Sequence, residues 1–257
     1  MIKFFRRIRQ NMIKENRVSK YLLYAIGEIV LVVVGILIAL SINNWNIEEQ
    51  ERNEEIETLK NLRLDFKNTI KELNELKYIR NTAMTNIRII FSIIETKKNP
   101  YSEKELDTIL MRAIIPPTYN SQSGTLDMLF NSGKINIISN NKIKNLLISW
   151  PGLVSDMTEE ELMLHHLQYE QHFTILFQHL SFGNVIKTFK YRNIPFHTFP
   201  KGSFVSDYGA FFRDNRKENI MAIKMMLLML IESGSDLLTN AAKEIINEID
   251  IELKTEN

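Results

Sequence analysis

The sequence predicts an all-α fold, in which an N-terminal amphipathic helix and a single transmembrane helix continue into a helical bundle or coiled-coil-like outer domain. Two patterns predict it. Residues 21–42 are apolar apart from Glu28, and residues 46–98 contain no proline or glycine while apolar side chains recur every three or four positions. The 257 residues leave room for one moderate domain after the span. We therefore divide the chain into a basic segment of residues 1–20, a span of 21–45 and an outer domain of 46–257.

Residues 1–20 place bases and apolar side chains on opposite sides of a helix, at about 100° per residue. Such a helix lies on an anionic inner leaflet, with its rings towards the lipid and its bases among the phosphates. A second interpretation, compatible with the first, is that these bases only set the membrane topology. The predicted membrane-surface residues are Lys3, Phe4, Phe5, Arg6, Arg7, Ile8, Lys14 and Arg17.

The apolar run is long enough to cross a membrane. As a helix it measures roughly 33 Å, against a hydrocarbon core of about 30 Å. Bases precede it and glutamates follow it, which predicts a cytoplasmic N-terminus and an external domain after Trp45. A cleaved signal peptide is the alternative, because Ala39-Leu40-Ser41 resembles a cleavage site. The run is too long for that, and Glu28 would be unusual in a signal peptide.

Glu28 predicts a contact surface on the span. Counted around a helix, Tyr24, Gly35, Ala39 and Asn46 lie within about 40° of Glu28, and the small residues there let another helix approach closely. An ionised acid facing lipid at this depth would cost several kcal/mol, so we expect it to be protonated or partnered, with Tyr24 as one donor. We predict that this face joins copies of the chain. The alternatives are a carboxylate that handles ions or protons and an incidental protonated residue.

The outer domain reads as a series of helices. Leu59, Leu62, Phe66, Ile70, Leu73 and Leu76 form one apolar stripe that predicts burial in a bundle or coiled coil. Asn99-Pro100 ends this helix, and Ser102 and Glu105 form a capping box for the next, which ends before Pro116. The later helices are expected to end at Ser132-Gly133, to run from the Ser139–Asn141 cap to a stop before Pro151, and to occupy 156–180, 216–232 and 236–254.

Three histidines recur every seven residues, at His165, His172 and His179. Seven residues separate successive rings by about 10.5 Å along a helix, which is too far for one metal ion without other ligands. We therefore expect helix packing and no metal site, with metal binding and pH sensing as the alternatives.

Residues 183–212 are rich in aromatics that could fill a core or line a ligand groove. Lys187, Lys190, Arg192 and Lys201 lie among them, but the external location argues against nucleic acid. Ser121-Gln122-Ser123-Gly124 lacks the context of a nucleophile elbow or phosphate loop. The chain has no cysteine. We expect no enzyme and no cofactor.

Three stretches resemble a family of uncharacterised bacterial single-span membrane proteins: MIKFFRRIRQ, KYLLYAIGEIVLVVVGILIALSINNWN and SGTLDMLFNSGKINIISNNKIKNLLISW. The resemblance implies a membrane anchor and a helical extracytoplasmic domain, and it assigns no catalytic residue. With the topology above, we expect an inner-membrane protein whose outer domain is periplasmic.

The sequence thus predicts a homo-oligomeric scaffold or sensor of the bacterial envelope. Its partners would be a bilayer with an anionic inner leaflet, further copies of the chain, and an envelope protein or small ligand at the outer domain. An ion- or proton-conducting assembly that uses Glu28 is the alternative function.

Overall fold

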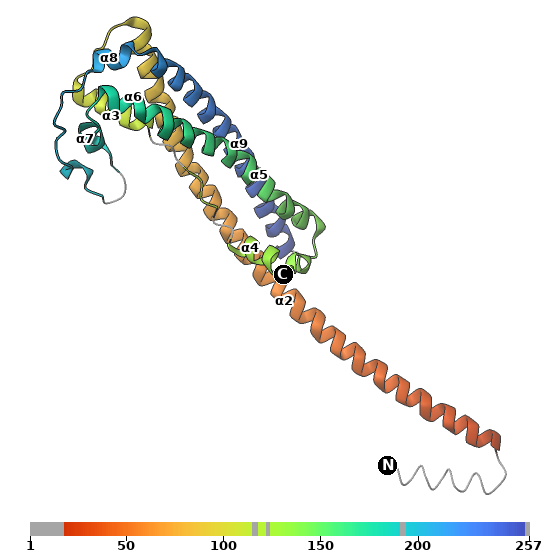
Figure 1. Cartoon of the computed structure of the whole chain (residues 1–257). Helices are drawn as coiled ribbons and strands as arrows, with labels where there is room; N and C mark the ends of the chain where they lie inside the picture. The colour runs from red at the N-terminus through yellow and green to blue at the C-terminus, as the bar shows by residue number, and fades with distance from the viewer. Residues whose placement is uncertain (1–17, 115–117, 122–123, 191–193, 255–257) are drawn as a thin grey trace. The chain divides into compact units, whose positions relative to one another are not determined.

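The computed structural model describes residues 18–114, 118–121, 124–190 and 194–254, and its elements are all helices (Figure 1). This confirms the all-α prediction. The predicted membrane-surface residues, between Lys3 and Arg17, lie outside the described residues. The chain forms two compact units, residues 1–57 and residues 58–257, and helix α2 (Val18–Thr96) contributes to both.

The first unit consists, as far as it is described, of the start of α2. Its apolar side chains are exposed, with Leu23 at 75% and Leu31 at 74% exposed. Among the described residues, α2 is the one helix long and apolar enough to cross a membrane, and none of its most apolar stretch is buried. This finding is compatible with a membrane anchor.

In the second unit, α2 buries the stripe that the sequence predicts. Leu59, Leu62, Phe66, Leu73 and Leu76 are buried, and Ile70 packs against them. Each buried leucine contributes about 1.5–3 kcal/mol of transfer free energy relative to an exposed one. The stripe is therefore the surface through which α2 joins the core.

The predicted end of α2 and the capping box after it are confirmed. α2 stops at Thr96, and Lys97 follows with a φ of 54°. The backbone N–H of Ser102 donates to the Glu105 carboxylate over 2.8 Å, and the N–H of Glu105 points back to the Ser102 hydroxyl at 3.4 Å. These reciprocal bonds satisfy backbone donors at the start of α3 (Glu103–Ile114).

Helix α9 (Asn215–Lys254) packs antiparallel to two other helices. Along α2, residues 63, 77 and 80 pair with residues 250, 236 and 232 of α9. Along α5 (Asn141–His166), residues 140 and 142 pair with 252 and 248. In both series, residue numbers that rise along one helix pair with residue numbers that fall along α9. The edge of Phe66 from α2 meets Trp150 of α5 at 4.9 Å between ring centroids, which closes a three-helix core.

The predicted stop before Pro151 is wrong, because α5 continues through this proline to His166. Asn140 caps α5 as expected, with its side-chain oxygen accepting from the N–H groups of Lys142 and Ile143. Proline inside a helix costs about 3 kcal/mol. The apolar face continues on both sides of it, with Leu147, Trp150 and Met157 buried, and this burial offsets the loss.

The predicted division between 216–232 and 236–254 is also wrong, because α9 is one helix. Gly234 falls between the two predicted helices and lies where α9 meets α5. A Cβ atom at this position would stand 3.1 Å from both Cβ and Cγ of Met157. The glycine therefore serves close helix packing and does not end the helix.

The remaining elements are short. They are α4 (Gly124–Asn131), η1 (Lys134–Ile137), the π-helix η2 (Leu167–His172), α6 (Phe173–His179), α7 (Phe182–Val185), η3 (Ile186–Thr188), η4 (Phe196–Thr198) and α8 (Tyr208–Arg213). Helix α4 ends before Gly133, as predicted, and that glycine has a φ of 69°. Segment 183–212 is irregular, also as predicted, with its short helical turns against α3 and α6.

Candidate functional site

The predicted contact face of the span consists of Tyr24, Glu28, Gly35, Ala39 and Asn46, all exposed on α2. Because α2 is helical throughout, the spacing that places them on one side is maintained. A Cβ atom at Gly35 would meet nothing within 4 Å. The face therefore offers a second helix a surface with little side-chain bulk, and whether copies of the chain meet there stays a prediction.

The histidines that the sequence places every seven residues lie in three different environments. His165 is half-buried and stacks on Tyr169 at 5.9 Å between ring centroids. His172 is fully buried, and the Nε2 atom of His179 lies 3.2 Å from a carboxylate oxygen of Asp214. In the part of the chain that the structure describes, no group of three or more His, Asp or Glu side chains could hold a metal ion.

The π-helix η2 explains why His172 lies in the core. The N–H of Phe173 donates to the carbonyl of Gln168, one residue further back than in an α-helix. This wider turn buries both Gln168 and His172. The Nδ1 atom of His172 lies 3.1 Å from the side-chain oxygen of Gln168, and burial holds the pKa of His172 well below its usual value. His172 is therefore neutral in the folded protein.

Lys224 of α9 reaches the same buried group. Its Nζ atom donates to the side-chain oxygen of Gln168 and, over 3.0 Å, to the backbone oxygen of Ile114. Lys224 is 1% exposed, and this burial lowers its pKa to about 7. These bonds are made with neutral acceptors. The group joins η2, α9 and the end of α3 through polar contacts inside an otherwise apolar core.

A second buried polar group lies between α2 and α9. The Nε atom of Arg80 donates to Glu232 over 2.7 Å, and a terminal guanidinium nitrogen donates to the hydroxyl of Ser235, also over 2.7 Å. Arg80 is fully buried. Nearby, the buried carboxylate of Glu161 accepts from the N–H of Tyr119 at 3.0 Å, and burial raises the pKa of Glu161. These contacts fix the register between helices.

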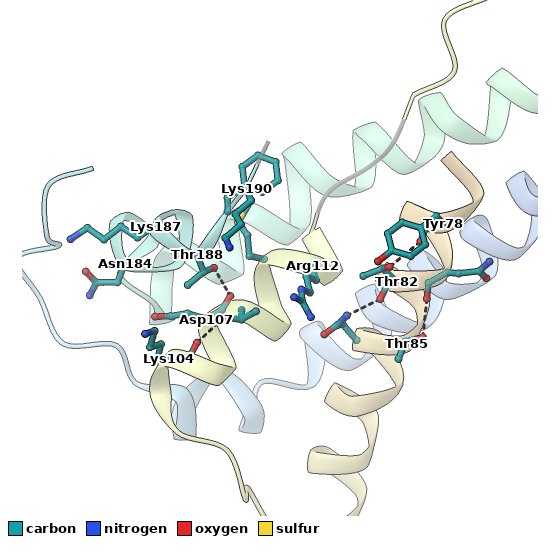
Figure 2. A pocket seen from close by; sticks show the side chains of 15 residues that line it. Tyr78, Thr82, Thr85, Lys104, Asp107, Arg112, Asn184, Lys187, Thr188 and Lys190 are labelled. Carbon is teal, nitrogen blue, oxygen red and sulfur yellow. Dashed lines mark hydrogen bonds between the residues drawn. The ribbon is translucent and has the colours of Figure 1, made fainter. Parts of the chain in front are cut away.

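An open cleft of about 1110 Å³ lies on the second unit (Figure 2). Its walls come from three segments: α2 from Tyr78 to Asn86, α3 from Lys104 to Arg112, and residues 184–190. Four basic side chains line it, together with one acid and several amides and hydroxyls. The basic ones are Lys104, Arg112, Lys187 and Lys190, and the acid is Asp107.

Partial signals for the buried Lys224 and for the cleft are present in the sequence. Lys224 interrupts an apolar run from Ile220 to Ile231, which is the mark of a buried lysine, and Lys187 and Lys190 lie among aromatics. The sequence could not show that Lys104 and Arg112 share a cleft with them, because those bases come from a helix some eighty residues earlier.

The aromatics of residues 183–212 both fill the core and line open surface. Phe211 is fully buried, whereas Phe199 and Phe204 are 47% and 51% exposed. Phe189 lines the cleft of Figure 2, and its ring packs at a tilt against Phe196, with 5.0 Å between ring centroids. Phe211 therefore confirms the core interpretation, whereas ligand binding at the aromatics that line the cleft stays a prediction.

Comparison with known proteins gives a family match over part of the chain. The model of a family of unknown function, DUF6090, matches residues 28–150. The matched part begins in the apolar stretch of α2 and ends at Trp150 in α5, and it agrees with the resemblance to a family without an assigned activity. Neither a curated protein nor a solved structure matches the chain.

Proposed function

We propose that this protein is a membrane-anchored scaffold or sensor of the bacterial cell envelope, with a cytoplasmic N-terminus and a periplasmic helical domain. A contrast within α2 supports this proposal most. Leu31, before residue 58, is 74% exposed, whereas Leu59 and Leu62, just after it, are fully buried. An exposed apolar helix of this length is stable in lipid and unfavourable in water. In this proposal the outer domain binds and does not catalyse.

The topology can be tested by labelling, because the chain contains no cysteine. A single cysteine introduced at Lys243, an exposed position on α9, should react with a membrane-impermeant maleimide in intact spheroplasts. A second variant with cysteine at Lys14 should react only after the membrane is permeabilised. The reverse pattern, or labelling of both in intact spheroplasts, would overturn the proposed topology.

Self-association through the span is the second part of the proposal. Gly35 and Ala39 give a surface on which two helix backbones come close, and transmembrane helices associate through such small residues. Tyr24 and Glu28 add hydrogen-bonding groups on the same face, where polar side chains join helices in lipid. A lipid-embedded oligomer would hold several outer domains together, as a scaffold requires.

Native mass spectrometry of the full-length protein in lipid nanodiscs tests this contact. We expect a defined oligomer that is lost in the double variant Gly35→Leu, Ala39→Leu and retained in Gly27→Leu, which adds similar bulk off the face. A Cβ atom at either glycine meets nothing within 4 Å in the single chain, so loss of the oligomer reports the contact and not misfolding. A monomeric wild type would refute self-association.

Ion or proton conduction through an assembly of spans is the rival function, and Glu28 within the apolar run favours it. Glu28→Gln separates the two. An amide still forms hydrogen bonds, so the oligomer should persist, whereas conduction by a carboxylate should disappear. Conductance of wild-type proteoliposomes that is abolished by Glu28→Gln would replace the scaffold proposal with this one.

A further inference from the structure

The cleft of Figure 2 concentrates positive charge on a protein that is nearly neutral. Over the whole sequence, 32 Lys and Arg side chains are balanced by 31 Asp and Glu, yet the cleft holds four bases and one acid. Two bases come from α3 and two from residues 187–190. Segments far apart in the sequence thus bring bases together without their matching acids.

Other bases on the same unit form ion pairs with acids of the chain, whereas among the described residues the bases of the cleft do not. Elsewhere Arg63 pairs with Asp250 at 2.6 Å, Lys77 with Asp236 at 2.8 Å, and Lys142 with Glu248 at 2.9 Å. Within the described part of the chain, none of the four cleft bases forms an ion pair. Their charge is available to something outside the chain.

Asp107, the one acid of the cleft, already has a hydrogen-bond partner within the protein. Its carboxylate accepts a hydrogen bond from the hydroxyl of Tyr208, and its side chain is buried. Burial also raises the pKa of Asp107. Because Asp107 is buried and bonded to Tyr208, it does little to neutralise the four bases at the open side.

The rest of the lining suits a small polar ligand. The side-chain oxygen of Asn184 accepts from the N–H of Gly202 over 3.1 Å, which leaves the amide nitrogen as a donor. The rings of Tyr78 and Phe189 line the same cleft. Ligand sites usually occupy about 300–1,000 Å³ and combine apolar surface with a few polar groups.

We propose that this cleft binds a phosphate-type anion through its four bases, Lys104, Arg112, Lys187 and Lys190. An arginine fork donates two parallel hydrogen bonds to two oxygens of one phosphate, and lysines add charge without a fixed geometry. A free phosphate ester and a phospholipid headgroup share this chemistry. This anion would be the ligand of the proposed sensor. Binding itself does not depend on the sensor function, but its role in the cell does.

Isothermal titration calorimetry tests the proposal on the full-length protein in nanodiscs of neutral phosphatidylcholine. The probes are inorganic pyrophosphate, for a free phosphate ester, and glycerophosphoglycerol, for a lipid headgroup. The cleft variant is Arg112→Gln, Lys187→Gln, and the matched control is Lys243→Gln, Lys254→Gln, which removes two exposed bases from α9. The single variant Lys187→Gln is measured in case the cleft variant does not fold, which circular dichroism will show.

We expect one of the two probes to bind, about tenfold or more weaker to the cleft variant and unchanged in the control. Preference for pyrophosphate identifies a free phosphate ester, and preference for glycerophosphoglycerol identifies a headgroup. No binding of either probe, or equal binding to the cleft variant, overturns the proposal. Native mass spectrometry of the same nanodiscs reports anchoring and assembly separately, so this failure is distinct from failure of the membrane scaffold.

Discussion

The Nζ atom of Lys224, on α9, donates a hydrogen bond of 3.0 Å to the backbone oxygen of Ile114, the last residue of α3. The last carbonyls of a helix have no partner within it, and they attract positive charge. A lysine from a helix 110 residues away thus serves as the C-terminal cap of α3. Its burial ties the end of one cleft wall to the core.

Lys224 should make stability depend on pH above neutrality. Its pKa is about 7 in the folded protein, against 10.5 for an ordinary exposed lysine. At a pH between these values, the unfolded chain therefore binds a proton that the folded chain does not. Stability then rises with pH, by up to about 1.4 kcal/mol per unit. Denaturation followed by Trp150 fluorescence, measured between pH 7 and 10, should show the rise.

Lys224→Met provides the comparison for this rise, because it fills similar space without a charge. Other groups that titrate in the same range, such as Lys217, affect both proteins equally. The difference in free energy of unfolding between wild type and variant should therefore change steadily with pH. A constant difference would show that Lys224 is not buried as a titrating group.

Gly234→Ala should destabilise the second unit. The new methyl group would lie 3.1 Å from Met157, and overfilling a packed helix contact typically costs about 1–3 kcal/mol. Gly152→Ala is the control, because a Cβ atom there meets nothing within 4 Å and alanine favours a helix by about 0.5–1 kcal/mol. Melting temperatures from circular dichroism should move in opposite directions. A stabilised Gly234→Ala protein would mean that α5 and α9 are further apart than described.

Removing the partner of Arg80 should cost more than removing that of Arg63. Glu232→Gln leaves a fully buried guanidinium without its carboxylate, and breaking a buried ion pair in this way costs about 3–5 kcal/mol. Asp250→Asn breaks a pair whose side chains are 39% and 32% exposed, and such pairs contribute about 0–1 kcal/mol. Urea unfolding of both variants measures the contrast.

The double variant Arg80→Leu, Glu232→Leu then tests the reason for that cost. Replacing both charges removes the unpaired guanidinium, so the double variant should be more stable than Glu232→Gln alone. If the double variant were the less stable of the two, the pair itself would be the source of stability.

Ser102→Ala should loosen the first turn of α3 by about 1 kcal/mol, because it removes the hydroxyl half of the capping box. Hydrogen exchange of the amides in residues 103–106 should accelerate. Ser92→Ala, at an exposed position inside α2, is the control and should leave exchange at α3 unchanged. Equal exchange in wild type and Ser102→Ala would assign the start of α3 to tertiary packing instead.

Local signals in the sequence predicted most of the helices. The stripe from Leu59 to Leu76 and the capping box at Ser102 depend on neighbouring residues, and both are confirmed. Pro151 misled the prediction because its usual helix-breaking effect is overcome by packing between α5 and α9, and the predicted division of α9 was wrong because the helix continues past Gly234. Such packing depends on residues some eighty positions apart, which periodicity does not reveal.

The proposed surfaces were predictable to different degrees. The face around Glu28 follows from the period of a single helix, so the sequence was sufficient to place Gly35 and Ala39 beside it. The cleft required the positions of α3 and residues 184–190 relative to α2. The π-turn beside His172 was not predicted, because nothing in its neighbouring residues indicates it.

That π-turn acts as an insertion of one residue into an otherwise continuous helical path from α5 to α6. In a continuous α-helix, one inserted residue would turn everything downstream by about 100°; the wider turn takes up that residue, so Ile175 and Leu176 stay on the core. Deleting one residue between Leu167 and Gln171 would restore the α-helical repeat and leave α6 on the same face, but it would remove the turn at which Gln168 and His172 are buried. The extra residue therefore serves the buried polar group around Lys224 and not the packing of α6.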